Sequence, residues 1–308
     1  MKNQENPQIL SLFEFSRKFS SESAVAKYLV NRRWPGGKIC PHCNSSRTVE
    51  IVSKKPMPYR CQGCRKHFSI RTGTVLAESK IPLVKWFFAI YLMTTARKGI
   101  SSVQLAKELG VTQKTAWFLE HRIREAYRQK GGLLGNEVEI DETYIGGKEK
   151  NKHAHKKLQA GRGAVGKQAV MGMKQRGGSV RAFTIKETGR IDLQAAIVEN
   201  VKRGSSVYTD CHRSYMGMKG YNHKVVKHSV GEYVKGQVHT NGIESFWALL
   251  KRGYYGIFHN MSFKHLHRYV NEFSTRYNLG HDTIACLNAV TDAMVGNRLT
   301  YKALKAVI

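Results

Sequence analysis

The chain has 308 residues, of which 41% are hydrophobic and 24% charged, so composition excludes a disordered protein and favours two or three folded domains. Lys and Arg number 51 against 22 Asp and Glu, a net charge of +29, which indicates a polyanionic partner such as double-stranded DNA. The sequence has no run of eighteen apolar residues and no apolar signal core, which excludes a membrane protein and predicts a cytoplasmic one without disulfides.

Residues 1–37 are predicted to form a small N-terminal helical segment. Apolar residues recur at the spacing of one helix face at Leu12, Phe15 and Phe19. The serines between residues 20 and 23 interrupt this run, and one of them is expected to cap a second short helix. The segment carries no catalytic signature, so we expect it to serve as a packing element for the neighbouring domain.

Residues 38–72 are predicted to form a zinc ribbon. Cys40-Pro-His-Cys43 and Cys61-Gln-Gly-Cys64 are two Cys-x-x-Cys knuckles separated by seventeen residues. Four thiolates at this spacing complete a closed tetrahedral shell around Zn²⁺. A closed shell leaves no position for a reacting water, so the predicted zinc is structural. The pattern leaves open whether the ribbon contacts DNA or only braces its neighbours.

Residues 80–130 are predicted to form a helix-turn-helix DNA-binding domain. An apolar helix at 82–95 precedes two short helices, with Ser101 and Thr112 as their caps and Gly110 in the turn between them. The second helix of such a unit enters the major groove through its N-terminal residues. The candidate DNA contacts are therefore Gln113, Lys114 and Thr115. A plain three-helix bundle is the alternative, which the net charge disfavours.

Residues 134–296 are predicted to be one α/β domain with a central sheet, followed by a C-terminal tail at 297–308. The expected strands are 138–145, a hairpin of 168–174 and 180–186 across Gly177-Gly178, 206–210, and a short strand at Val225 and Val226. The expected helices are 192–201, 239–252, 262–278 and 284–294. Strands and helices in this order are typical of a mixed α/β domain.

A basic, glycine-containing stretch at 146–167 comes after the first strand of this domain. We expect it to become ordered on phosphate, although a merely solvated loop is the simpler interpretation of any single residue in it. The candidate DNA contacts in this stretch are Lys148, Lys156, Lys157 and Arg162.

The helix expected at 239–252 has two faces at about 100° per residue. Its apolar face holds Ile243, Phe246, Trp247 and Leu250. Glu244 and Lys251 lie two turns apart on the polar face, with Arg252 next in the chain. By itself this pattern is typical of any surface helix, with Thr240 or Asn241 as its cap.

Three carboxylates are candidates for metal binding. Asp141 lies in the first strand, Asp210 ends a later strand, and Glu244 heads the helix. A phosphodiester resists attack because the nucleophile meets negative charge, and two magnesium ions overcome this by activating the attacking oxygen and stabilising the leaving one. Asp141 would bridge both ions while Asp210 and Glu244 complete one side each. Glu142 points to the opposite face of the strand and is not expected to be a ligand.

These residues resemble the DDE motif of bacterial insertion-sequence transposases, in which Lys251 is the trailing basic residue. Longer motifs resemble the ISXO-like group: Ile-Asp-Glu-Thr-Tyr-Ile-Gly-Gly-Lys at 140–148, Gly-Arg-Gly-Ala-Val-Gly-Lys at 161–167, and the stretches 239–252 and 264–273. The resemblance implies an N-terminal zinc ribbon, a helix-turn-helix and an RNase H-like catalytic domain. It also implies binding of terminal inverted repeats and movement of a DNA element.

The sequence therefore predicts a DDE transposase that cleaves a strand at each element end and transfers the 3′-OH into target DNA. Its expected cofactors are two Mg²⁺ (or Mn²⁺) ions per active site and one structural Zn²⁺. Two DNA ends must be handled together, so a homodimer or larger complex is expected on DNA in the bacterial cytosol. A non-catalytic DNA-binding regulator is the main alternative, and a plain nuclease with the same fold is a third.

Overall fold

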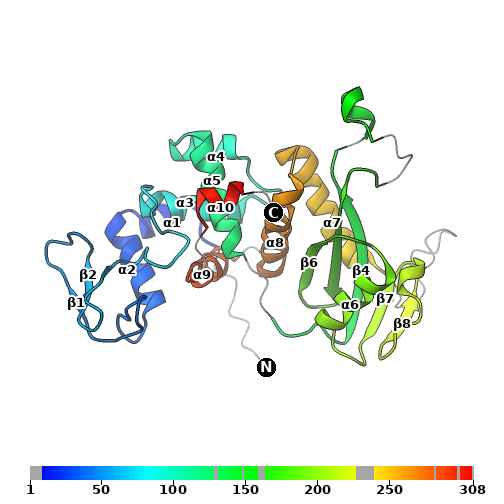
Figure 1. Ribbon diagram of the computed structural model, residues 1–308, viewed down its shortest axis with the longest axis horizontal. Coiled ribbons are helices and arrows are strands. Elements are labelled where there is room, and N and C mark those ends of the chain that lie inside the picture. The colour runs from blue at the N-terminus through cyan, green and yellow to red at the C-terminus, as the bar shows by residue number, and fades with distance from the viewer. Residues whose placement is uncertain are drawn as a thin grey trace. The chain divides into compact units, whose positions relative to one another are not determined.

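The structure is a computed structural model that describes residues 9–127, 131–147, 149–158, 164–226, 239–280, 282–296 and 299–306. The chain forms two compact units, Met1–Arg128 with His281–Ile308, and Gln129–Gly280 (Figure 1). Both helices and sheets are present, so the fold is a multidomain mixed α/β one. Among the described residues, no helix is sufficiently long and apolar to cross a membrane.

The first unit is largely helical. Its helices are α1 (Leu12–Lys18), α2 (Glu22–Arg33), α3 (Leu83–Thr95), α4 (Ser102–Leu109), α5 (Gln113–Ala126), α9 (Thr283–Ala293) and α10 (Tyr301–Lys305). Short polar side chains begin several of these helices; at the start of α2, for example, Ser21 accepts the backbone N–H of Ala24. Apolar side chains from α1, α2, α3 and α5 fill one core, with Phe15, Phe19 and Trp86 almost fully buried.

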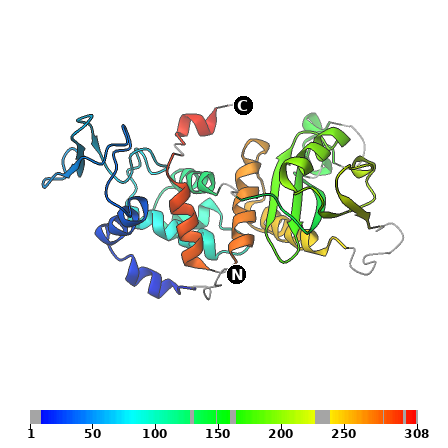
Figure 2. The same ribbon diagram turned by 90° about the horizontal axis from the view of Figure 1, so that it is seen from below.

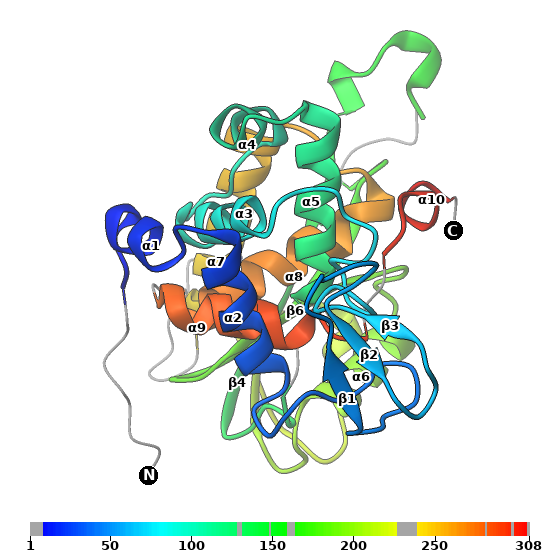
Figure 3. The ribbon, with the colours of Figure 1, turned by 90° about the vertical axis from the view of Figure 1, so that its left-hand side faces the viewer.

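The domain boundary predicted at residue 296 differs from the structure. Helix α9 was expected to close the catalytic domain, but it packs against α2, α3 and α5 of the first unit (Figure 3). Leu287 and Val290 are each 1% exposed in that core, and the Tyr28 hydroxyl donates to the Asn288 side chain. Helical periodicity identified the helix but could not identify the surface that covers its apolar face.

The cysteine-containing segment is a three-stranded antiparallel sheet of β1 (Thr48–Glu50), β2 (Tyr59–Cys61) and β3 (His67–Phe68). Three aromatic rings, from the end of α2 and from the sheet, contact one another beside it: those of Trp34, Tyr59 and Phe68. This small sheet therefore has an aromatic layer of its own on one side.

The second unit contains a five-stranded sheet in the order β6-β5-β4-β7-β8. Its strands are β4 (Glu137–Ile145), β5 (Gln168–Gln175), β6 (Val180–Ile185), β7 (Ser206–Thr209) and β8 (Asn222–Val225). Strands β4, β5 and β6 pair antiparallel, with Gly177 in the left-handed region at the expected hairpin turn, whereas β7 and β8 continue parallel to β4. Strand β4 is therefore central, as expected for a strand that bears a buried site.

Helices cover both faces of this sheet. On one face α6 (Arg190–Asn200) packs Leu193 and Ile197 against β4, β5 and β7. On the other face lie α7 (Asn241–Gly253), the π-helical turn Tyr254–Phe258 and α8 (Phe263–Leu279), which can be followed in yellow and orange in Figure 2. Two short 3-10 turns, Glu149–Asn151 and Ala154–Lys156, come after β4, and a third, Arg213–Tyr215, comes after β7.

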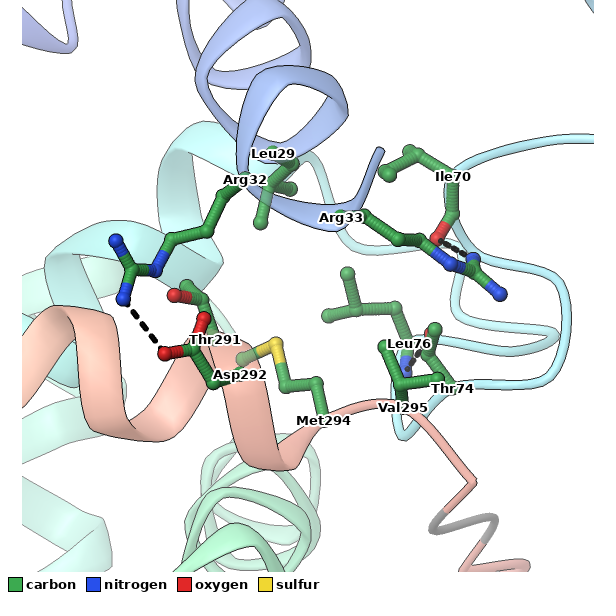
Figure 4. Close-up of a pocket in the computed structure, with 10 residues that line it drawn as sticks. All are labelled: Leu29, Arg32, Arg33, Ile70, Thr74, Leu76, Thr291, Asp292, Met294 and Val295. Atoms are coloured by element: carbon green, nitrogen blue, oxygen red, sulfur yellow. Dashed lines mark hydrogen bonds and ion pairs between the residues drawn. The ribbon is translucent and has the colours of Figure 1, made fainter. Parts of the chain in front are cut away.

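A cavity of about 160 Å³ lies in the first unit between α2, the segment after the ribbon and the end of α9 (Figure 4). Arg33 donates from one wall to the carbonyl oxygens of Ile70 and Thr72, and Arg32 pairs with Asp292 at 2.6 Å on another. Both arginines are thus engaged in holding elements of the unit together. None of the side chains predicted to carry chemistry lines this cavity.

Candidate functional site

The four predicted zinc ligands converge. Cys40 and Cys61 are buried, and the Sγ atoms of all four cysteines lie within 4.8 Å of one another. The Cys40–Cys64 and Cys43–Cys61 Sγ distances are 3.7 and 3.6 Å. Four sulfurs about 2.3 Å from a tetrahedral ion are about 3.8 Å apart, so the set fits one Zn²⁺ with no open position.

Asp141 lies in β4, and Asp210 directly follows β7, the strand that pairs parallel with β4. The pairing of β4 with β7 ends at Glu139 and Tyr208, and the same register continued by two residues reaches Asp141 and Asp210. Residues that share a register position in a parallel pair point to the same face, across a strand spacing of about 4.8 Å. Asp210 comes immediately after β7, where its Oδ1 accepts the backbone N–H of His212 at 3.0 Å.

Glu244 lies in the first turn of α7 on the face of the sheet that Asp141 occupies. The apolar side of α7 is buried as expected, with Ile243, Phe246 and Leu250 at 0% exposure and Trp247 at 4%. Glu244 remains exposed, and the Thr240 hydroxyl donates to its Oε1 at 2.8 Å. The buried apolar side of α7 therefore anchors the helix on the sheet, while the Glu244 carboxylate on its other side stays exposed.

Trp247 contacts Asp141 directly. Its indole Nε1–H donates to Asp141 Oδ2 at 2.9 Å. The cross-strand partner of Asp141 on β5 is Gly172, and a Cβ built there would lie 2.5 Å from the Trp247 ring. Because Gly172 has no side chain, the Trp247 indole can lie over it and contact the Asp141 carboxylate. The sequence pattern assigned Trp247 to packing alone.

Two carboxyl groups of β4 have raised pKa values. Burial raises the pKa of Asp141 from 3.8 to about 6, and the charges of Asp210 and Glu244 add to this rise. Burial likewise raises the pKa of Glu142 to about 7, with the Tyr215 hydroxyl opposing the rise. Tyr215 belongs to the core on the α6 face, so Glu142 points away from Asp141's side of the sheet. A divalent cation would relieve the repulsion around Asp141.

The four cysteines lie closer together than the three carboxylates do. Within the part of the chain that the structure describes, the four cysteines alone bring three or more ligand atoms within 4.8 Å of one another. The three carboxylates are spread more widely. Two ions about 3.5–4 Å apart need ligands around both of them, so a wider set is compatible with a two-metal site.

The predicted helix-turn-helix segment consists of α4 and α5 joined by Gly110 in the left-handed conformation. Gln113 donates to the Ser102 hydroxyl at 2.8 Å, and the Thr115 hydroxyl lies 2.8 Å from the Thr112 hydroxyl that caps α5. Lys114 is exposed, with its Nζ 5.3 Å from the centre of the Tyr301 ring. Of the three candidate DNA contacts, Lys114 is thus the most available to a ligand.

The remaining basic candidates divide into two groups. Lys251 and Arg252 are exposed in the last turn of α7, and Arg252 Nε donates to the carbonyl of Ala248 at 3.0 Å. Lys157 is exposed after a 3-10 turn. Lys148 and Arg162, with the side chain of Lys156, lie outside the described residues.

Sequence reasoning missed one charged group that contacts the start of α7. Glu139 on β4 is 1% exposed, and it accepts hydrogen bonds from Arg176 and from the backbone of Ile243. The strand also contains Glu137, Asp141 and Glu142, so Glu139 did not stand out in the sequence. Its partners are far away in sequence, so the pattern could not indicate them.

Comparison with known proteins identifies the class. Residues 132–278 match the ISXO2-like transposase domain, and residues 20–67 match a transposase zinc-ribbon domain. The chain is therefore a zinc-ribbon transposase-type protein of an insertion sequence, and the DDE domain implies an RNase H-like fold for the second unit.

A curated relative agrees with this class. The "uncharacterized protein in transposable element ISH50" of Halobacterium salinarum is 31% identical over 247 residues, which cover 76% of this chain and 83% of the relative. The chain belongs to the ISXO2-like transposase family.

One solved structure is a remote match. It is the simian T-cell lymphotropic virus intasome in complex with the PP2A regulatory subunit B56 gamma, with 16% identity and a TM-score of 0.29. The match covers 60% of this chain and 65% of that one.

Proposed function

We propose that the chain is a metal-dependent DDE transposase whose active site consists of Asp141, Asp210 and Glu244. The observation that supports this most is the parallel pairing of β4 with β7, because the same register continued by two residues would bring Asp141 and Asp210 to the sheet face where Trp247 of α7 contacts Asp141. Three acidic side chains from three elements at one place are costly without a cation. Membership of the ISXO2-like transposase family supports DNA strand cleavage and transfer as the reaction of this site.

The carboxylates would hold two Mg²⁺ or Mn²⁺ ions, which supply activation of the attacking oxygen and stabilisation of the leaving one. Asp141, Asp210 and Glu244 would each supply carboxylate oxygens to these ions. Trp247 keeps one Asp141 oxygen fixed through its N–H. Lys251 would hold a nearby phosphate as a point charge, because it lies two turns from Glu244 on the exposed side of α7.

Element recognition would use α4 and α5 as a helix-turn-helix, with Lys114 leading and Gln113 and Thr115 beside it. The basic stretch containing Lys148, Lys156, Lys157 and Arg162 would bind the phosphate backbone, as the net charge of +29 favours. We propose that the protein binds the terminal inverted repeats as a homodimer or larger complex, cleaves each end and joins the 3′-OH to target DNA.

Strand cleavage on oligonucleotides that carry the inverted repeats flanking the gene tests this function. Asp141→Ala or Asp210→Ala should abolish Mg²⁺- or Mn²⁺-dependent cleavage and leave end binding intact. Glu142→Gln is the matched control, because this carboxylate neighbours Asp141 but faces α6, and it should cleave within a few-fold of the wild type.

Full cleavage by either aspartate variant would contradict the assigned site. Binding of the ends without any metal-dependent nicking by the wild type would instead indicate a DNA-binding regulator. Cleavage without joining of the 3′ ends to target DNA would indicate a nuclease. Each result separates one alternative from the transposase.

A further inference from the structure

Glu139 is a buried carboxylate next to the proposed active site that the proposed reaction does not use. It lies on β4 two residues before Asp141, so both side chains project from the same face of the sheet. Its relative exposure is 1%. A carboxylate this deeply buried is stable only if its oxygens are paired and hydrogen-bonded.

Both oxygens of Glu139 have partners, and each partner lies near the start of α7. Oε2 accepts the backbone N–H of Ile243 at 3.0 Å. Oε1 accepts Nε–H of Arg176 at 3.0 Å and lies 3.3 Å from Nδ1 of His239. Arg176 also donates to the carbonyl of His239 at 3.0 Å, and its guanidinium lies 4.4 Å from the centre of the Tyr208 ring. Strands β4 and β7, the β5–β6 hairpin and the entry to α7 are thus tied together.

The contact to Ile243 replaces an ordinary helix cap. Thr240 is the N-cap of α7, but its side chain accepts no hydrogen bond from the first turn; its hydroxyl donates to Glu244 instead. The first N–H groups of a helix have no partner within the helix, and a negative charge near them is favourable. Glu139 supplies that acceptor and charge from a strand 104 residues away.

Ile243, which donates this hydrogen bond, directly precedes Glu244. We propose that Glu139, held by Arg176 beside His239, is a positioning residue that fixes the first turn of α7 and so orients Glu244 toward a divalent cation. This inference rests on the proposed function, since it takes Glu244 as a metal ligand. Glu139 itself contacts neither the cation nor DNA in this scheme.

Gly242 provides an independent way to disturb the same contact. A Cβ built on Gly242 would lie 2.7 Å from Glu139 Oε2, so an alanine there must displace the carboxylate from Ile243. Alanine is otherwise the better helix former. If only helix propensity mattered, Gly242→Ala would make α7 more ordered; if the Glu139 contact matters, it would make the first turn less ordered.

The experiment uses the full-length protein, Mn²⁺ titration by calorimetry, and hydrogen–deuterium exchange of peptides that span 239–247. Glu139→Gln and Gly242→Ala should each weaken Mn²⁺ binding about 10- to 100-fold, the usual effect of removing a group that orients a ligand. Both should speed exchange at the start of α7 while leaving exchange of β4 and α6 unchanged.

Two matched controls separate positioning from general damage. Glu137→Gln removes the other carboxylate near Arg176, which lies 3.5 Å from its Nη1. Gly256→Ala adds a Cβ with nothing within 4 Å. Both controls should bind Mn²⁺ within about two-fold of the wild type, since neither contacts the first turn of α7.

Unchanged Mn²⁺ affinity in Glu139→Gln and Gly242→Ala would overturn the inference, whether or not exchange changes. Equal weakening in Glu137→Gln would also overturn it. Failure of the proposed function gives a different result: wild type and Asp141→Ala would then bind Mn²⁺ equally. That result would show that Glu244 is not a metal ligand. The exchange data would then show only that Glu139 stabilises the first turn of α7.

Discussion

The zinc ribbon and the carboxylate site are built in opposite ways. The ribbon gathers four ligands from two short knuckles, and their sulfurs already stand at the spacing of a tetrahedral shell. The carboxylates come from β4, the end of β7 and α7, and burial together with their charges raises the pKa of Asp141 to about 6. A closed shell of four ligands suits a metal that holds a fold, whereas an open set of mutually repelling carboxylates suits ions that must also meet a substrate.

The largest expected effect concerns the ribbon. Cys43→Ser should release the zinc and unfold residues 38–72, because a structural Zn²⁺ contributes on the order of 10 kcal/mol to folding of such modules. Metal analysis and circular dichroism measure this. Cys211→Ser, at an exposed cysteine outside the cluster, should keep one zinc per chain. Chelation of Mg²⁺ should leave residues 129–280 folded. If these residues unfolded, the carboxylate site would also depend on metal for folding, and the contrast between the two sites would be wrong.

The second effect concerns the space beneath Trp247. Gly172→Ala would place a Cβ 2.5 Å from the indole and 2.7 Å from Ile243 Cδ1, so we expect a loss of about 1–3 kcal/mol in unfolding free energy and a weaker contact to Asp141. Denaturant unfolding measures the loss. Gly132→Ala, which meets nothing within 4 Å, is the matched control and should be near neutral. A neutral Gly172→Ala would show that the indole moves freely.

The third effect concerns pH. The folded state raises the pKa of Asp141 from 3.8 to about 6, so it binds the proton more tightly than the unfolded state does. Without divalent metal, the free energy of unfolding should therefore fall as pH rises from about 4 to about 6. Asp141→Asn should remove this slope and stabilise the metal-free protein at pH 7 by about 3 kcal/mol. Thermal unfolding of both proteins across this pH range measures the difference in stability. A less stable Asp141→Asn variant would show that the Asp141 charge is not unfavourable in the metal-free site.

The smallest effect concerns Lys251. If it holds a phosphate beside the carboxylates, Lys251→Ala should weaken DNA binding a few-fold and lower the salt slope by about one, without changing Mn²⁺ affinity. Fluorescence anisotropy at several salt concentrations measures this. Lys219→Ala, also at an exposed lysine of the second unit, should change neither quantity. Equal effects from both lysines would indicate only the general basic charge.

Much of the fold could be predicted from local pattern. Knuckle spacing predicted the cysteine cluster, and the hairpin at Gly177 and the apolar face of α7 agree with the structure. These features depend on residues close in sequence, where periodicity and turn chemistry act. The boundary at 296 was wrong because an apolar helix face does not specify its partner, and α9 is buried against α2 and α3.

By itself, the sequence indicated most of the helices and strands, but not α10 (Tyr301–Lys305) in the expected tail. It also determined which cysteines group, and which three acids and which lysine should be tested as a set. Only the tertiary structure decided that Asp141 meets Trp247 across the empty position at Gly172, and that Glu139 caps α7. Those contacts join residues 106 and 104 positions apart. Such pairs arise from strand register and from helix packing on the sheet, which no local pattern encodes.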